Sequence, residues 1–372
     1  MVIGTPRESN QDEYRVGLTP FGVARLVHEG QSVLVEQGAG LAARFSDQDF
    51  EKAGAQIVYR SEELYRRADI VCRVGALSAD EIAMLKPKAI ICGFHHLAVA
   101  PRDHVARLME LKATLIGYEI IRDAAGDLPV LTPISEMAGQ MAMHVAANLL
   151  QNHSGGRGVL LGSVAGVPPP TVLILGAGAV GVAAARQAAA AGAHVIVLDA
   201  DVRKLRALHR NFSGEVVTVV AAMDRLERYT ALADVVIGAV LIPGARSPFV
   251  VTESMVRAMK PGSVIIDVSI DQGGCIETSR PTTIGDPTFV YHDVVHYCVP
   301  NMTANLARTA SRALATATLP YLVELSGHGL TRVLREDPGF AAGVYLYDGV
   351  MVNAAAGGVL GFPAAAISQL IS

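Results

Sequence analysis

The sequence predicts an α/β protein of two doubly wound domains, the first of which is completed by helices from the C-terminal end of the chain. Two observations support this fold class. Short apolar runs alternate with helical patterns up to about residue 305, as is typical of parallel sheets with crossover helices. A chain of 372 residues is also long for one hydrophobic core, so we expect two domains.

Residues 1–130 and 306–372 are predicted to form the first domain. Its expected strands lie at residues 33–35, 70–72, 89–91 and 114–116, and its expected helices include residues 47–53 and 79–85. Residues 306–372 have a mostly helical pattern, in which Pro320 caps or kinks a run near residues 314–325. Because this segment is short for an independent domain, we expect it to return and pack on residues 1–130.

The second predicted domain, residues 131–305, contains the most informative motif. An apolar strand at residues 172–175 leads into Gly176, Gly178 and Gly181, which have G-x-G-x-x-G spacing, and then into an alanine-rich helix. Such glycines permit a tight turn, the approach of a pyrophosphate to the backbone, and close packing of the helix on the strand. Further strands of this Rossmann-like sheet are expected at residues 233–238 and 263–267.

Asp199 ends the next strand, about 20 residues after the glycines. A carboxylate there accepts hydrogen bonds from an adenosine ribose and repels a 2′-phosphate, so the motif predicts NAD rather than NADP. The nearby cations Arg203 and Lys204 weaken this preference. The alternative is an ordinary glycine-rich turn, but the ordered succession of strand, glycines, helix, strand and acid favours dinucleotide binding.

Composition limits the class of partner. Charged residues make up 18% of the chain and the formal net charge is −4, so nothing predicts nucleic-acid or membrane binding, and a small-molecule substrate is expected. We expect no spanning helix and no metal site. Scattered cysteines and an N-terminus without an apolar signal region predict a reduced, cytoplasmic setting. Abundant Ala and Gly predict close helix packing in a homo-oligomer.

Two segments place side chains suited to proton transfer after parallel strands. His95 and His96 follow the strand at residues 89–91, and Asp271 follows the strand at residues 264–268. Histidine titrates near neutrality and exchanges a proton with an alcohol or amine as a hydride leaves carbon. Taken alone, each of these residues is more often a structural or surface residue, so this alternative stays open here.

Motifs spread along the whole chain point to one family. They are EYRVGLTP (residues 13–20), FHHLA (94–98), SEMAG (135–139), GAGAVG (176–181), IGAVLIPGA (237–245), MKPGSVIIDVSIDQGGC (259–275), SRPTT (279–283) and ATLPYLVEL (317–325). In their order and spacing the sequence resembles the alanine dehydrogenase family, which also includes the nucleotide-binding part of pyridine nucleotide transhydrogenase.

The resemblance implies a role for individual residues. Arg15 would bind the substrate carboxylate, for which a planar guanidinium is suited. His96 would be the catalytic acid/base and Asp271 the second catalytic residue. The transhydrogenase branch has asparagine at the latter position, so Asp271 favours net chemistry on a substrate. The implied cofactor-binding residues are Ser135, Gly176, Gly178, Ala179, Val180, Gly181, Asp199, Lys204, Val240, Leu241, Ile270, Asn301 and Met302.

Three segments depart from the family pattern. Where the family usually has K-V-K-E-P, with the second lysine binding the substrate, this chain has R-V-G-A-L at residues 73–77. The loss of a charge-assisted hydrogen bond typically costs roughly 1.5–3 kcal/mol, and Gly75 leaves room for a bulkier or differently charged substrate. Arg73, on the same side of an extended strand, is a candidate replacement for this cation.

The other two departures lie near the same predicted pocket. His95 replaces an apolar or aromatic residue beside the catalytic histidine, which makes it a candidate substrate-binding residue together with Arg73. The loop at residues 301–307 lacks the two stiffening prolines of the family's N-M-P-G/A-x-V-P. We interpret these changes as favouring an altered substrate preference.

The sequence therefore predicts an NAD-dependent oxidoreductase that reversibly deaminates an L-amino acid to a 2-oxo acid and ammonia, or reduces a related imine. A true alanine dehydrogenase, and a weakly active or inactive NAD-binding protein with a regulatory role, stay open as alternatives. A transhydrogenase-like role needs a membrane partner and is the least favoured. By resemblance, the homo-oligomer would be a hexamer.

Overall fold

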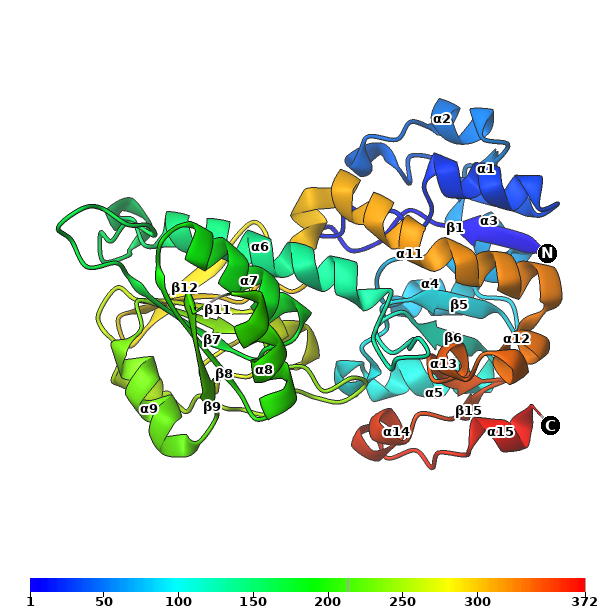
Figure 1. Ribbon diagram of the computed structural model, residues 1–372. Helices are drawn as coiled ribbons and strands as arrows, with labels where there is room; N and C mark the ends of the chain where they lie inside the picture. Colours follow the sequence, from blue (N-terminus) through cyan, green and yellow to red (C-terminus); the bar gives the residue numbers. More distant parts are fainter. Residues whose placement is uncertain (213, 372) are drawn as a thin grey trace. The chain divides into compact units, whose positions relative to one another are not determined.

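The computed structural model describes residues 1–212 and 214–371. These residues form two compact units, each built around its own sheet (Figure 1). Unit 1 comprises Met1–Ile134, Pro243–Ala245 and the C-terminal segment from Ala304, and unit 2 comprises Ser135–Ile242 and Arg246–Thr303. Within the described ranges, no helix is both long and apolar enough to cross a membrane.

The sheet of unit 1 is parallel except at one edge. Its strands are β1 (Val2–Thr5), β2 (Ser32–Glu36), β3 (Gln56–Val58), β4 (Ile70–Cys72), β5 (Ile90–Gly93), β6 (Thr114–Gly117), β14 (Val344–Tyr347) and β15 (Val350–Met351). They lie in the order β15-β14-β6-β5-β4-β1-β2-β3. The central strands β4 and β5 are buried along their whole length, as expected for apolar strands covered on both faces.

Two helices of unit 1 begin at capping boxes that satisfy free N–H groups of their first turns. Ser46 and Asp49 form a reciprocal capping box at the start of α2, and Ser78 and Glu81 form one at the start of α4. The helix α11 continues through Pro320, so this proline does not cap it. The helices are α1 (Pro20–His28), α2 (Asp47–Lys52), α3 (Ser61–Arg67), α4 (Ala79–Met84), α5 (Arg102–Glu110), α11 (Ala307–His328), α12 (Leu330–Glu336), α13 (Pro338–Ala341), α14 (Ala354–Leu360) and α15 (Ile367–Leu370).

The C-terminal segment adds strands as well as helices to the first sheet. β14 pairs antiparallel with β6, and β15 pairs antiparallel with β14. The sequence pattern predicted mostly helices in this segment and did not predict these strands. The predicted fold class is confirmed, with this antiparallel edge as an addition.

Unit 2 is a doubly wound sheet with one antiparallel edge strand. Its strands are β7 (Thr171–Leu175), β8 (His194–Asp199), β9 (Val216–Val220), β10 (Val235–Gly238), β11 (Val264–Asp267), β12 (Thr288–Tyr291) and β13 (Val294–Tyr297). They lie in the order β12-β13-β11-β10-β7-β8-β9, and β12 alone of these strands runs antiparallel to its neighbour. The strands expected near residues 172–175, 233–238 and 263–267 are β7, β10 and β11.

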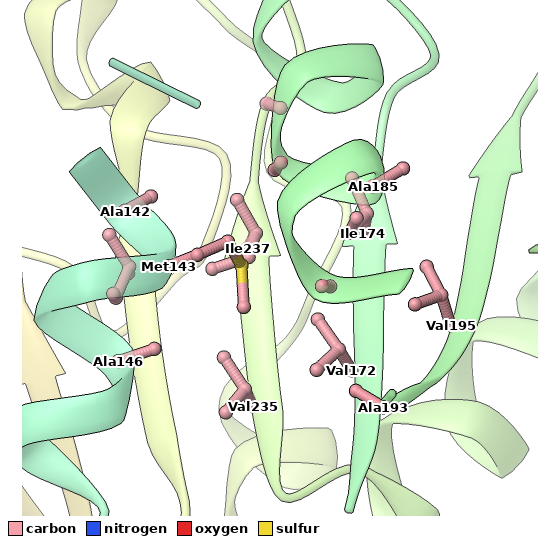
Figure 2. Close-up of a cluster of buried hydrophobic side chains, with 14 of the residues drawn as sticks. Ala142, Met143, Ala146, Val172, Ile174, Ala185, Ala193, Val195, Val235 and Ile237 are labelled. Atoms are coloured by element: carbon pink, nitrogen blue, oxygen red, sulfur yellow. The ribbon is translucent and has the colours of Figure 1, made fainter. Parts of the chain in front are cut away.

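A core of small and branched side chains joins the helices of unit 2 to its sheet. Figure 2 shows Ala142, Met143 and Ala146 of one helix in the same buried cluster as Val235 and Ile237 of β10. Alanine on the helices allows such close approach of helix and sheet. The helices are α6 (Leu131–Leu149), α7 (Ala179–Ala190), α8 (Val202–Asn211), α9 (Met223–Leu232) and α10 (Glu253–Arg257).

Candidate functional site

The glycine turn of unit 2 has a distinct steric reason for each of its glycines. Gly176 adopts a φ of 109°, and a Cβ there would lie 2.3 Å from the carbonyl oxygen of Ala239. A Cβ on Gly181 would lie 1.9 Å from the carbonyl oxygen of Gly176. A Cβ on Gly178 would meet no described heavy atom within 4 Å. The first and third glycines therefore serve packing, whereas the second keeps a surface open.

The first N–H groups of α7 lie beside that open surface. Gly178 is the N-cap residue, and no side chain of the described residues caps the helix. The first N–H groups of a helix have no partner within the helix and carry the positive end of its dipole. Ala179 and Val180 occupy this first turn and are half-buried. The turn thus has the properties of an anion site for phosphate groups.

Asp199, at the end of β8, is hydrogen-bonded to the glycine turn. Its Oδ2 accepts a hydrogen bond from the backbone N–H of Ala177 at 2.7 Å, and its Oδ1 accepts one from Asp201 at 2.7 Å. The structure therefore brings Asp199 and the glycine motif together, as the sequence pattern requires. Lys204, also predicted to contact the cofactor, lies exposed on α8.

The loop that carries Asp271 is organised by a second, buried carboxylate. Asp267 accepts hydrogen bonds from the backbone N–H groups of Ser269 at 3.1 Å, Cys275 at 3.0 Å and Ile276 at 3.3 Å. Burial raises the pKa of Asp267 despite these donors. Oδ1 of Asp271 in turn accepts the N–H of Asn301 at 2.7 Å. Two residues predicted for the site, Asp271 and Asn301, are thereby brought together.

The remaining predicted cofactor residues lie around the same strand ends of unit 2 or on α6. The N–H of Val240 donates to Oγ of Ser269 at 2.9 Å, which ties the end of β10 to the Asp271 loop. Ser135, Ile270 and Met302 are buried, whereas Leu241 is exposed. The contact of these residues with a cofactor stays a prediction.

In unit 1 a single carboxylate organises the turn that carries His95 and His96. Oε1 of Glu119 accepts hydrogen bonds from the backbone N–H of His95 at 3.1 Å and of His96 at 2.6 Å, and from the hydroxyl of Tyr345 at 3.0 Å. His96 has a φ of 45°, a left-handed conformation that is unusual for a residue other than glycine. Such local strain is typical of functional sites and needs support from the surrounding structure, which Glu119 supplies here.

The two histidines differ in their surroundings. The ring of His96 stacks on Phe94 with 6.1 Å between ring centroids, and its Nδ1 is buried without a hydrogen-bond partner among the described residues. His95 is fully enclosed, with Nε2 3.3 Å from the carbonyl oxygen of Ile91. Burial lowers the pKa of His95 to about 4, so its ring is neutral at pH 7.

Arg15 and Arg73 are both buried and both held by carboxylates. Arg15 donates from Nε to Glu13 Oε1 at 2.7 Å and from Nη2 to Glu13 Oε2 at 2.5 Å. Arg73 pairs with Glu8 at 2.9 Å and Glu81 at 3.0 Å. Its Nη1 donates to the hydroxyl of Tyr65 at 3.1 Å, and its Nε donates to the carbonyl oxygen of Gly75 at 2.6 Å. The contact of Arg73 with a substrate stays a prediction.

These arginines belong to the same neighbourhood as the histidine turn. The N–H of Arg73 donates to Cys92 O at 3.0 Å, and the N–H of Phe94 donates to Val74 O at 2.8 Å, so β5 and the segment after β4 run side by side up to the turn. A Cβ on Gly17, two residues after Arg15, would lie 2.8 Å from Cα of Arg73, so the segment that carries Arg15 also runs beside Arg73.

Sequence reasoning did not identify Glu8, Glu119 or Asp267. Each of these carboxylates binds backbone N–H groups, and Glu8 also binds an arginine that is distant in sequence. A backbone N–H group is present in almost every residue, so the sequence does not show which of them a carboxylate will bind. Glu8 accepts the N–H of Val74 at 2.7 Å across 66 residues, and Glu119 reaches back 23 residues to His96. For Glu119 and Asp267 the available signal was an acidic residue in an otherwise apolar segment, which is rarely buried without a partner, whereas Glu8 lies in a polar segment and had no such signal.

Comparison with known proteins places the chain in a family. Residues 4–138 match the model of the N-terminal domain of alanine dehydrogenase/PNT, and residues 142–354 match that of its C-terminal domain. The chain belongs to the alanine dehydrogenase/PNT family. This family was the one suggested by the motifs of the sequence.

Its relatives in this family match it from end to end. The chain is 43% identical over 363 residues to an alanine dehydrogenase of Mycobacterium tuberculosis, covering 98% of both chains, and 43% identical to one of Halomonas elongata, covering 100% of both. A solved L-alanine dehydrogenase superposes with a TM-score of 0.88 at 40% identity, covering 97% of this chain and 99% of the other. A transhydrogenase from Sinorhizobium meliloti gives a TM-score of 0.77 at 25% identity, covering 95% and 100%.

Proposed function

We propose that this member of the alanine dehydrogenase/PNT family is an NAD-dependent amino-acid dehydrogenase. It reversibly converts an L-amino acid to a 2-oxo acid and ammonia, or reduces a related imine. The observation that carries the proposal is the turn at His96, a left-handed turn that Glu119 holds on a strand end in a chain related over its full length to alanine dehydrogenases. On this basis residues 1–130 with 306–372 form the substrate domain and residues 131–305 the NAD-binding domain.

The glycine turn fits the proposed cofactor. The open surface at Gly178 and the uncapped start of α7 suit a pyrophosphate, and Asp199 is placed at the strand end where a ribose is bound in such folds. We assign the other cofactor contacts to Ser135, Ala179, Val180, Lys204, Val240, Leu241, Ile270, Asn301 and Met302. Bound NAD supplies the acceptor for the hydride that leaves the substrate Cα.

The chain's own residues bind the substrate and move its protons. Arg15, preoriented by Glu13, binds the α-carboxylate through its planar guanidinium. His96 accepts the proton released as the amine is oxidised and returns it in the reverse direction. Asp271 orients the water and ammonia that add to the imine. Arg73 and His95 complete the substrate side of the site in this proposal.

The proposal extends to the cellular compartment and the oligomeric state of the protein. The cysteines of the described residues are unpaired and buried, which suits a reducing compartment, and we propose that the protein acts in the cytoplasm on a small molecule. We also propose a homo-oligomer, with a hexamer as the family resemblance implies.

The test is NADH oxidation in the presence of ammonia and a panel of 2-oxo acids. We expect turnover by the native chain, and its loss in His96→Ala and Asp271→Asn, while both variants keep the native NADH affinity. A native chain that binds NADH but turns over no member of the panel would instead be the divergent, NAD-binding relative without dehydrogenase activity.

A further inference from the structure

Position 75 in unit 1 faces open space bordered by a carboxylate. A Cβ built on Gly75 would have Oε2 of Glu8, at 3.6 Å, as its nearest described neighbour outside the adjacent residues, and nothing else within 4 Å. The backbone of Gly75 has no positive φ, so the space follows from the missing side chain and not from a special turn. An elongated group of a ligand can therefore enter here and meet Glu8.

The Glu8 carboxylate has hydrogen-bonding capacity left. It accepts hydrogen bonds from Arg73 at 2.9 Å, from the N–H of Val74 at 2.7 Å and from the N–H of Gly75 at 3.3 Å. A carboxylate has about four acceptor sites in total. Oε2, the oxygen nearest Gly75, already accepts the bonds from Arg73 and Gly75, so a further donor from a ligand can be accommodated at Oε1, which accepts the N–H of Val74.

Negative charge dominates this end of the first sheet. The carboxylates of Glu8, Glu13, Glu81 and Glu119 are all nearly inaccessible, while the printed ion pairs supply Arg15 and Arg73 as cations. With His95 neutral and all four carboxyl groups ionised, the cluster carries two more negative than positive charges, and burial accordingly raises the pKa of Glu8. An excess of negative charge among buried groups is unfavourable unless a bound cation or a proton compensates it.

Neither Arg73, which sequence reasoning offered as a replacement cation, nor His95, which it offered as a substrate-binding residue, directs an uncommitted positive charge into the space beside Gly75. Arg73 lies beside Gly75 and donates to its carbonyl oxygen, but its guanidinium is engaged by Glu8, Glu81 and Tyr65. His95 points its Nε2 back to a carbonyl oxygen of its own strand. The electrostatics of the space beside Gly75 therefore favour a ligand that brings its own positive charge.

We propose that the substrate of this chain is an L-amino acid with a terminal amino or guanidino group, whose cationic end lies beside Gly75 and donates to Glu8. This inference rests on the dehydrogenase function proposed above and specifies its substrate class. The α-carboxylate binds Arg15, and the apolar part of the side chain fills the space that Gly75 leaves open.

The test compares chain-matched amino acids that differ in terminal charge. L-Ornithine, L-norleucine and L-glutamate are measured as substrates for NAD reduction, and their affinities are measured by calorimetry in the presence of NADH, with which an amino acid does not react. One charge-assisted hydrogen bond gives roughly a 10- to 100-fold preference. We expect this preference for ornithine over norleucine in both assays, with glutamate the poorest.

Variants locate the source of the preference. Gly75→Lys adds a cation beside Oε2 of Glu8, the oxygen that also pairs with Arg73, and should make ornithine a poorer ligand than norleucine. Ala76→Lys, which adds the same charge at the exposed neighbouring residue, is the matched control and should keep the native preference. Glu8→Gln should bring the ratio of the two affinities close to one.

The two assays separate this inference from the proposed function. Preferential binding of ornithine without NADH formation supports the cationic pocket and contradicts the dehydrogenase function. Equal affinity for ornithine and norleucine overturns the inference, whatever the turnover. A native preference that survives Gly75→Lys also overturns it, because the cation would then be bound elsewhere.

Discussion

Glu119 shows how one buried residue determines the geometry of the candidate site. Its carboxylate satisfies two successive backbone N–H groups of a strained turn, and Tyr345 donates to the same oxygen. The strain at His96 persists because hydrogen bonds to a charged acceptor offset it. The position of the proposed catalytic imidazole thus depends on a residue that touches only its backbone.

Replacing Glu119 with Gln should slow the reaction more than it weakens the fold. Gln keeps one carbonyl oxygen but loses the charge, and hydrogen bonds to charged groups contribute about 1.5–3 kcal/mol. We expect kcat to fall at least about 10-fold with NADH affinity unchanged. Tyr345→Phe, which removes one donor and leaves the turn's N–H bonds in place, is the control and should lose less; an equal loss in both variants would contradict this role.

His95 should make the stability of the protein depend on pH in the acidic range. Its pKa is lowered from 6.5 to about 4 by burial, so the unfolded chain takes up the proton first as the pH falls. The stability from neutral His95 is complete above about pH 6.5 and is lost progressively down to about pH 4. The loss amounts to about 3 kcal/mol.

Chemical denaturation at pH 7 and pH 4.5 checks this contribution. His95→Leu removes the titrating group, so the free energy of unfolding should fall less between these two pH values than it does in the native chain. Other titrating groups are common to both proteins and cancel in the difference. An unchanged difference would mean that His95 is accessible to protons in the folded state.

At the scale of elements, the glycine turn was the feature best predicted from sequence. Its strand, helix and terminal acid follow one another locally, so their spacing alone specifies the arrangement. The antiparallel strand β14 was missed because its partner β6 lies more than 200 residues away in sequence, and β15 was missed because it has only 2 residues and pairs with β14. Glu8 and Glu119 were missed for the same reason, since long-range contacts define both roles.

Two glycine variants separate the ligand surface from the packing surface of this turn. Gly178→Ala places a methyl group in open space, so it should fold with native stability and bind NAD more weakly. Gly181→Ala forces a methyl group against the carbonyl oxygen of Gly176 and should cost about 1–3 kcal/mol of stability. Thermal unfolding and NAD titration of both variants test this; a stable Gly181→Ala protein would contradict the close packing.

The organising role of Asp267 in the loop after β11 can be tested by removing its charge. Asp267→Asn replaces an acceptor-only carboxylate by a group with an N–H₂, so at least one of the backbone donors of Ser269, Cys275 or Ile276 loses its partner. We expect faster hydrogen exchange in residues 268–276 and a lower kcat. The exposed Asp286→Asn is the control; native exchange in Asp267→Asn would refute the organising role.

For the whole molecule, family membership and chemistry have to be judged separately. The chain matches alanine dehydrogenases over its full length, whereas the amino acid that it converts depends, in the inference drawn above, on Glu8 and the space beside Gly75. A fold can keep its cofactor turn and its acid/base turn while its specificity changes. The assembly proposed here is a homo-oligomer, and native mass spectrometry should show a hexamer; a monomer would contradict it.

The most direct test of the central claim is the stoichiometry of products formed from an L-amino acid and NAD by the native chain. The account predicts equal amounts of NADH and free ammonia, with neither formed by His96→Ala. NAD binding without either product, for every amino acid with or without a terminal cation, would contradict the claim that this protein is an amino-acid dehydrogenase.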